Sequence, residues 1–479
     1  MAQIYQRIND MNRKWFLLLG IIVFLLSGCT MAPKYTRPDA PVPAKWPTGA
    51  AYKQTKSAAS APAAAELPWR EFFTDERLQK IIGIALDNNR DLRLAALNVE
   101  RARALYGIQR AELLPSVNAA GMMSKQLVPA DLSTTGSAMV AEQYSVNLGI
   151  TSWEIDFFGR IRSLKDQALE EYLATEDARR SAQISLVSAV AQAYLTLAAD
   201  RETLKLVIST LDAQETSYKL IRKRYDVGIS SELDLLRAQS QVDTARGDVA
   251  RYTQLTAQDE NALNLLVGSP LPQDDILTSD LGSINPPKEI SPGLSSELLL
   301  RRPDVLAAEH QLKAANANIG AARAAFFPRI SLTTAIGTAS ADLSGLFKAG
   351  QGTWLFAPQI MMPIFDARTW SAYDVTKVDK EISVAQYEKV IQTAFREVAD
   401  ALAVRGTVNQ QIAAQQSLVG AVAETYRLSN ARYTKGIDSY LSVLDAQRSL
   451  YGAEQVLIVL RLARINNTVA LYKVLGGGE

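Results

Sequence analysis

The side chains that most often carry catalysis are scarce in this sequence. Its 479 residues include one cysteine, Cys29, and one histidine, His310, which excludes an intrachain disulfide and a Cys/His zinc site. The glycine-rich phosphate-binding signatures do not occur in it. The pairs Met122-Met123 and Met361-Met362 carry thioethers of the kind that bind Cu(I), but both fall in stretches predicted as strands, where methionines more often pack or face lipid. We predict no enzyme, no metal site and no cofactor, and a structural role for His310.

The charge balance narrows the class of partner. Lysine and arginine number 51 against 50 aspartate and glutamate residues, so the chain is nearly neutral. A protein that binds nucleic acid presents a concentrated basic face, which this balance does not favour. With 48% hydrophobic residues, the composition favours a structural, transport or binding protein.

Cys29 lies where a lipid would be attached. Two basic residues precede an apolar run at residues 15–26, which is too short to span a bilayer but has the length of a signal-peptide core. The run leads into Leu26-Ser27-Gly28-Cys29, which resembles the bacterial lipoprotein box, where the thiol is acylated and the chain is cut before the cysteine. Thr30, in place of aspartate, implies sorting to the outer membrane. We therefore predict a signal peptide at 1–28 and a covalent lipid on Cys29; the alternative is a buried cysteine after an uncleaved anchor.

A proline- and alanine-rich segment follows the cysteine. Seven prolines fall between residues 30 and 68, which is typical of an extended tether that forms no core of its own. We assign 29–68 to this lipidated tether. At the other end, residues 475–479 include three consecutive glycines and are predicted to form a flexible tail.

The remainder is an internal duplication. The segment at 225–239, Tyr-Asp-Val-Gly-Ile-Ser-Ser-Glu-Leu-Asp-Leu-Leu-Arg-Ala-Gln, recurs at 433–447 as Tyr-Thr-Lys-Gly-Ile-Asp-Ser-Tyr-Leu-Ser-Val-Leu-Asp-Ala-Gln, without a gap and at an offset of 208. Shorter matches upstream have nearly the same offset. A fixed period of this kind indicates two copies of one structural unit. We place the first repeat at 69–285 and the second at 286–474.

Each repeat contains the same predicted elements. A helix leads to a proline, at about 90–113 and 303–326, because proline stops a helix. Two strand-like stretches follow, then a long helix, a tight turn and a second long helix. Alternation of apolar and polar residues, as at 144–151, is typical of a membrane barrel strand and also of a half-buried soluble strand.

The strand count has a consequence for assembly. Beyond residue 29 no run reaches 18 consecutive apolar residues, so we predict no helical span, and a membrane crossing would require β-strands. Two hairpins supply four strands, whereas a closed membrane barrel needs at least about eight. We expect the chain to close its barrel with copies of itself.

The long helices carry two apolar stripes. Ile184, Val187, Ala191 and Tyr194 form one stripe, and Leu186, Val190 and Leu197 lie on the other. Helices with two neighbouring stripes pack against a neighbour on both sides, which favours a cylinder of helices. The stretch 159–224 lacks proline and internal glycine and could extend for about 100 Å. An ordinary helical bundle is the alternative.

The combination of these features resembles the TolC-like outer-membrane factors, in particular their lipoprotein branch, the outer-membrane subunits of tripartite efflux pumps. The further motifs that carry the resemblance are Arg301-Arg302-Pro303-Asp304-Val305, Phe326-Phe327-Pro328, Asp156-Phe157-Phe158-Gly159-Arg160 and Gly476-Gly477-Gly478. The resemblance implies an α+β membrane protein: a homotrimer whose four strands per chain form a 12-stranded transmembrane β-barrel in outer-membrane lipid, continued by a long-helix α-barrel in the periplasm. It implies a passive exit duct for drugs or metal ions, with a periplasmic adaptor protein and an inner-membrane efflux pump as partners.

The two repeated turns are the first candidate site. A glycine permits positive φ as the first helix ends, and a serine can cap the next helix. The resemblance implies that these turns form the periplasmic tip on which the adaptor docks. The candidate docking residues are Gly228, Ile229, Ser231, Gly436, Ile437 and Ser439.

Asp445 is the second candidate site. The resemblance implies that it faces the channel near its closed end, where three copies would form a carboxylate ring that favours cations. The family often has a second acid three residues earlier, where this chain has Ser442, which weakens the case for a double ring. The matching positions in the first repeat are Asp234 and Arg237.

Other interpretations of these features stay open. Asp445 could pair with Arg224, Arg237 or Arg432 and help to hold the tip shut, or could simply be a solvated carboxylate. The whole chain could instead be an outer-membrane conduit of type I protein secretion, or a lipid-anchored periplasmic scaffold that does not conduct.

Overall fold

A computed structural model describes residues 30–52, 64, 67–272, 281–291 and 295–477. The predicted signal peptide at 1–28, Cys29 and the last two residues of the predicted tail lie outside these residues. The described chain divides into two compact units. The first holds residues up to 39, 98–175 and 307–387, and the second holds 40–97, 176–306 and 388–479.

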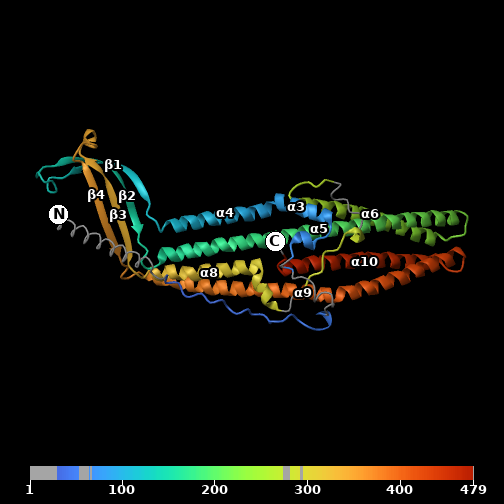
Figure 1. Ribbon diagram of the computed structural model, residues 1–479. Coiled ribbons are helices and arrows are strands. Elements are labelled where there is room, and N and C mark those ends of the chain that lie inside the picture. The colour runs from blue at the N-terminus through green and yellow to red at the C-terminus, as the bar shows by residue number, and fades with distance from the viewer. Residues whose placement is uncertain (1–29, 53–63, 65–66, 273–280, 292–294, 478–479) are drawn as a thin grey trace. The chain divides into compact units, whose positions relative to one another are not determined.

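The first unit contains a four-stranded antiparallel sheet. Its strands are β1 (Val117–Val128), β2 (Met139–Glu154), β3 (Arg329–Ser340) and β4 (Gly352–Met361), and they lie in the order β1-β2-β3-β4 (Figure 1). The prediction of two hairpins and four strands is confirmed. Within the described residues β1 and β4 each pair along one side only, so both outer edges have unpaired backbone groups.

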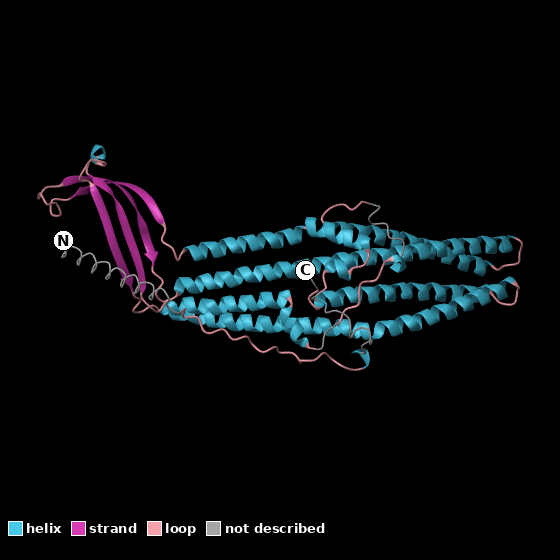
Figure 2. Ribbon diagram, viewed as in Figure 1, coloured by secondary structure: helices cyan, strands magenta, loops and turns pink. Residues whose placement is uncertain are grey.

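Helices make up most of the remaining chain (Figure 2). They are α2 (Trp69–Phe72), α3 (Glu76–Asn88), α4 (Arg90–Ala111), α5 (Arg160–Asp226), α6 (Glu232–Val267), α8 (Pro303–Ala324), α9 (Ala367–Thr434) and α10 (Tyr440–Val474), with short 3-10 turns between some of them. The two longest, α5 and α9, have 67 and 68 residues, in agreement with the absence of proline from their sequences. Helices α4 and α8 end two residues earlier than predicted.

Both apolar stripes predicted for α5 are buried. Val187, Ala191 and Tyr194 are buried on one stripe, and Val190 and Leu197 are buried on the other. Burial on two neighbouring stripes confirms that α5 packs against other elements on both sides.

One helix bears on the prediction that no helix spans the membrane. By length and composition, α5 contains an 18-residue window that is apolar enough to cross a membrane, although no run of 18 consecutive apolar residues exists. The mean hydropathy of a window can stay high when the window contains isolated polar residues. A run of consecutive apolar residues ends at the first polar residue. In the structure 61% of that window is buried inside the protein, as in a core helix.

Candidate functional site at the helical turns

The two repeated turns have the same backbone hydrogen bonds. In the first turn, residues 227–231, the N–H of Gly228 donates to the Tyr225 carbonyl at 2.9 Å and the N–H of Ile229 donates to the Arg224 carbonyl at 2.8 Å. In the second turn, residues 435–439, the corresponding bonds are both 2.9 Å. This pair of bonds is the Schellman motif, which requires a left-handed residue. Gly228 and Gly436 supply it with φ of +77° and +76°, as predicted.

The residues that begin the following helices differ between the repeats. The Ser231 hydroxyl accepts from the Asp234 N–H at 3.1 Å and donates to the Asp234 carboxylate at 2.8 Å, so this serine caps α6 as predicted. Ser439 occupies the same position before α10, but its side chain makes no capping hydrogen bond. In the second repeat Ser442 replaces Asp234, so the reciprocal acceptor is missing and the expected cap does not form.

An ion pair takes the place of that cap in the second turn. The Arg432 guanidinium donates to the Asp438 carboxylate at 2.5 and 3.2 Å. This hydrogen bonding holds the pKa of Asp438 below its ordinary value. The first turn has Ser230 at the matching position, so this pair is peculiar to the second turn.

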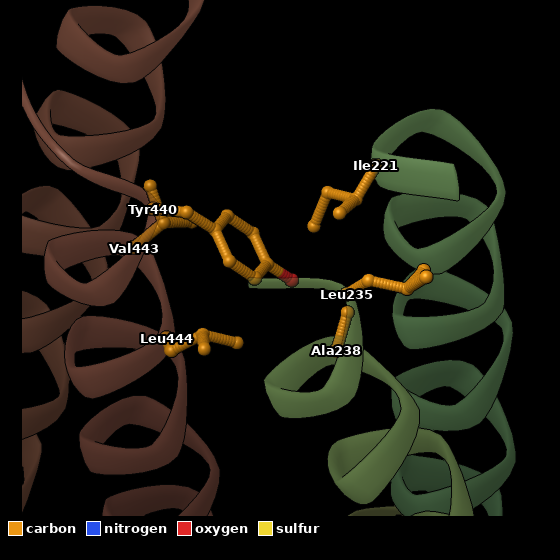
Figure 3. Close-up of a cluster of buried hydrophobic side chains, with 6 residues drawn as sticks. All are labelled: Ile221, Leu235, Ala238, Tyr440, Val443 and Leu444. Carbon is orange, nitrogen blue, oxygen red and sulfur yellow. The ribbon is translucent and has the colours of Figure 1, made fainter. Parts of the chain in front are cut away.

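A small apolar cluster joins the two helical hairpins. Ile221 from α5 and Leu235 and Ala238 from α6 pack against residues of α10, and the Tyr440 ring reaches toward them (Figure 3). The α10 residues of the cluster are Tyr440, Val443 and Leu444. Burial raises the pKa of the Tyr440 hydroxyl to about 12. The cluster ties the two hairpins together just behind their turns.

One cation adds a polar contact to this junction. The Arg224 guanidinium lies 5.0 Å from the centre of the Tyr433 ring, a distance at which a cation is attracted to an aromatic face. The Tyr433 and Tyr440 rings are 5.4 Å apart. The turns themselves remain apolar on their outer surface, since Ile229 and Ile437 are 73% and 59% exposed.

The expected arginine partners of Asp445 are engaged elsewhere. Arg432 binds Asp438, and Arg237 lies 3.9 Å from Asp234 on its own helix. Asp445 is exposed on α10, and among the described residues its carboxylate has no hydrogen-bond or ion-pair partner. Ser442 is exposed one turn before it. The predicted closing pair is therefore not formed within one chain, because Arg432 and Arg237 pair with nearer acids and Arg224 lies over the Tyr433 ring.

In the first repeat, the two matching gate candidates neutralise each other. Asp234 accepts a hydrogen bond from Ser231, and its i+3 neighbour Arg237 forms an ion pair with it at 3.9 Å, so both charges are paired at the start of α6. The position that corresponds to Asp445 is thus a paired cation in one repeat and an unpaired carboxylate in the other.

A second set of contacts, unexpected from the sequence, holds the segment that follows Cys29. Residues 31–37, which we call the strap, run without regular structure along α8. Asn316 donates to the Pro33 carbonyl at 2.8 Å and Arg323 donates to the Met31 carbonyl at 3.2 Å. The contacts are spaced by one to two helical turns, so a single face of α8 holds the strap.

The strongest strap contact centres on a buried carboxylate. Glu309 accepts two hydrogen bonds from Arg37, at 3.0 and 2.5 Å, and one from the Tyr35 hydroxyl at 3.2 Å. Burial alone would raise the pKa of Glu309, but Arg37 and Lys313 together hold it below its ordinary value. The Glu309 carboxylate is therefore charged and acts as a clamp on the strap.

The single histidine has a structural partner. His310 Nδ1 lies 2.5 Å from the Glu170 carboxylate, which joins α8 to α5 within the first unit. Met122, Met123 and Met361 lie in β1 and β4 as predicted, whereas Met362 comes just after the end of β4, and all four are exposed in the single chain.

Comparison with known proteins identifies the architecture. A sequence profile described as outer membrane efflux protein matches residues 81–269 and 294–477. The toluene efflux pump outer membrane protein TtgC of Pseudomonas putida is 52% identical over 466 residues, which cover 97% of this chain and 96% of TtgC. The solved structure of CusC matches with a TM-score of 0.82 at 42% identity, over 94% of this chain and 100% of CusC. The open-state MtrE outer membrane channel of Neisseria gonorrhoeae matches with a TM-score of 0.83 at 38% identity, over 94% and 98%.

Proposed function

The chain belongs to the outer membrane efflux protein family, and from this premise we propose that three copies form a passive exit duct across the outer membrane. The unpaired edges of β1 and β4 support the trimer. Open sheet edges are not tolerated in lipid, and four strands are fewer than the roughly eight that the smallest membrane barrels contain. Three copies of the sheet, joined edge to edge, satisfy both requirements.

In this proposal the helical turns are the docking surface for a periplasmic adaptor protein and an inner-membrane pump. The exposed apolar side chains of Ile229 and Ile437 support this role, because an apolar patch rimmed by charges is typical of a protein-binding surface. Docking opens the duct by separating the two hairpins at their shared cluster.

The proposed cargo is an apolar organic compound. The support is the name of TtgC, a toluene efflux pump protein, with 52% identity to this chain. The sequence resemblance is also compatible with a metal ion as cargo, and in that case the protein would export toxic cations. A strain that lacks this protein should lose tolerance to toluene and keep its tolerance to silver and copper ions. The reverse result would reassign the cargo.

Asp445 supplies the proposed gate charge. Its exposed carboxylate, without an intrachain partner, supports a ring of three acids at the narrow end of the duct. Such a ring attracts cations and repels anions. In the same proposal Cys29 carries a lipid that anchors each chain, and its presence is read from the mass of the peptide that begins at Cys29.

Planar-bilayer recording of the purified full-length protein tests the channel and the gate separately. We expect a trimer by native mass spectrometry and small, cation-selective currents. Asp445→Asn should shift the reversal potential in a salt gradient toward zero, whereas Asp87→Asn, which removes an exposed acid from α3, should not. A trimer whose selectivity is unchanged in Asp445→Asn would remove the gate assignment and keep the duct. A monomer without current would refute the duct and favour the scaffold.

A further inference from the structure

An aromatic groove lies beside the start of the strap. It has a volume of about 490 Å³ and belongs wholly to the first unit. Its lining residues are Met31, Arg323, Phe326, Phe327, Trp370 and Tyr373. Trp370 is 63% exposed, although an indole of this size is ordinarily covered in a folded protein.

Three aromatic rings of the groove pack against one another. Phe326, just beyond the end of α8, meets Trp370 edge to face at 4.7 Å and Tyr373 at 5.9 Å. Rings in this arrangement hold one another in place and leave their remaining faces available to an apolar ligand. The groove therefore offers a preformed apolar surface, built mainly by the end of α8 and the start of α9.

Two cations lie close to the Tyr373 ring at one side of the groove. Arg323 donates to the Tyr373 hydroxyl at 3.3 Å and to the Met31 carbonyl at 3.2 Å. Lys377 lies 4.6 Å from the centre of the Tyr373 ring. Aromatic rings flanked by lysine and arginine are the combination found where proteins meet the boundary between acyl chains and polar head groups.

The strap fixes one end of the chain at this groove. Asn316 holds the Pro33 carbonyl, and Gly320 lets the strap approach α8 so closely that a Cβ on Gly320 would lie 2.6 Å from the Ala32 nitrogen. Met31 is thereby placed in the groove wall. Only one residue separates Met31 from Cys29, and two extended residues span at most about 7 Å.

We propose that this groove is the seat of an acyl chain of the lipid carried on Cys29. The inference rests on the proposed lipidation of Cys29 and adds where the lipid lies. The occupant is set by the chain itself, because the strap delivers its own lipid attachment point to the groove within two residues. An acyl chain would cover the exposed face of Trp370, and Arg323 and Lys377 would face the polar glyceryl esters.

Photocrosslinking from the lipid tests this inference. Cells that produce the full-length protein are fed a fatty acid with a diazirine in its chain, and the membranes are irradiated before purification. The peptide that begins at Cys29 is first weighed, which shows whether the lipid is present. Crosslinks from that peptide are then mapped. We expect them at residues 323–327 and 370–373 of the same chain.

Matched variants show whether the groove itself holds the lipid. Trp370→Ser should reduce these crosslinks at least threefold, and Trp370→Phe should restore most of them. Phe347→Ser, which removes an even more exposed ring from the loop between β3 and β4, should leave them unchanged. The trimer mass of Trp370→Ser is measured as well, so that a loss of crosslinks is assigned to the groove and not to failed assembly.

Three results would overturn the inference. Crosslinks that join the Cys29 peptide only to bulk phospholipid would place the acyl chain in the bilayer. Crosslinks at residues 323–327 whose mass lacks the Cys29 peptide would make the groove a site for free phospholipid. An unmodified Cys29 would refute the lipidation itself, while trimer mass and bilayer currents would still report on the duct.

Discussion

The clamp on the strap allows a quantitative test through Glu309→Gln. The glutamine keeps the shape of the side chain and can still accept from Tyr35, but it removes the charge that Arg37 binds with two hydrogen bonds. Glu309 is 3% exposed, so the contact is shielded from water on the carboxylate side. The Arg37 side chain is 46% exposed, which reduces the effect of the pair.

These two facts set the expected magnitude. A hydrogen bond to a charged group contributes about 1.5–3 kcal/mol, and screening around Arg37 places the loss for the pair near the lower end, at about 2 kcal/mol. Since about 1.4 kcal/mol changes an equilibrium tenfold, the strap should open about 30-fold more often in Glu309→Gln. Arg37→Gln removes the same interaction from the other side and should have a similar effect. The double variant should be little worse than either single variant, because both substitutions remove one interaction.

Trypsin provides the assay, because Lys34 lies in the strap and is exposed. Cleavage after Lys34 releases a chain that begins at Tyr35, and its rate is followed by intact mass at low protease concentration. We expect about 30-fold faster release in Glu309→Gln and no change in Glu297→Gln, which removes an exposed acid elsewhere. Equal rates in Glu309→Gln and the wild-type protein would refute the clamp.

Acid should release the same clamp, and the sign follows from the lowered pKa. A carboxyl whose folded pKa lies below its unfolded value stabilises the folded state above the unfolded value, which is about 4.3 for glutamate. That stabilisation is lost as the pH falls through the lower, folded pKa of Glu309. Cleavage after Lys34, assayed with an acid-tolerant lysine-specific protease, should stay slow at pH 5 and accelerate only below about pH 4.

Four further substitutions test other local features by chemical unfolding in detergent. Gly436→Ala places a side chain at φ of +76° and should destabilise by about 1 kcal/mol, whereas Gly420→Ala, in open space within α9, should stabilise by about 0.5 kcal/mol. Burial, and then a hydrogen bond that the protonated carboxyl donates to Asp200, raise the pKa of Asp259 to about 7. Protonation of Asp259 therefore stabilises the folded state fully below about pH 4, and this stabilisation is lost as the pH rises to about 7. Asp259→Asn, which mimics the protonated form, should therefore become more stable than the wild type across that range. Arg302→Met should cost about 3 kcal/mol, because Arg302 is buried and bound to two carboxylates. Equal stability of Gly436→Ala and Gly420→Ala, a flat pH difference for Asp259→Asn, or a neutral Arg302→Met would each contradict the stated cause.

The turns could be predicted from sequence because their chemistry is local. A Schellman turn needs one residue at positive φ, and Gly228 and Gly436 are the residues that adopt it without strain. The bonds that close each turn join residues three and five apart. The repeat then doubles the evidence, since the same glycine occurs at the same place in both copies.

The strap contacts could not be predicted in this way. Arg37 and Glu309 are separated by 272 residues, and nothing in the sequence near either of them indicates the other. The predicted ion pair between Asp445 and Arg432 is absent for a different reason. Arg432 had several acids within reach, and the structure shows that Asp438, in the adjoining turn, binds it. A sequence offers candidate partners, but distance in the fold decides among them.

The unequal starts of α6 and α10 have a consequence for symmetry. In the proposed trimer the six turns would form one rim, and their matching Schellman bonds would give that rim an approximate sixfold repeat. Ser231 with Asp234 marks every second turn, and Arg432 with Asp438 marks the turns between them. The rim is therefore threefold in its charges and close to sixfold in its backbone. A partner built from identical subunits would meet two alternating kinds of binding site on this rim. It can distinguish them only through their side chains.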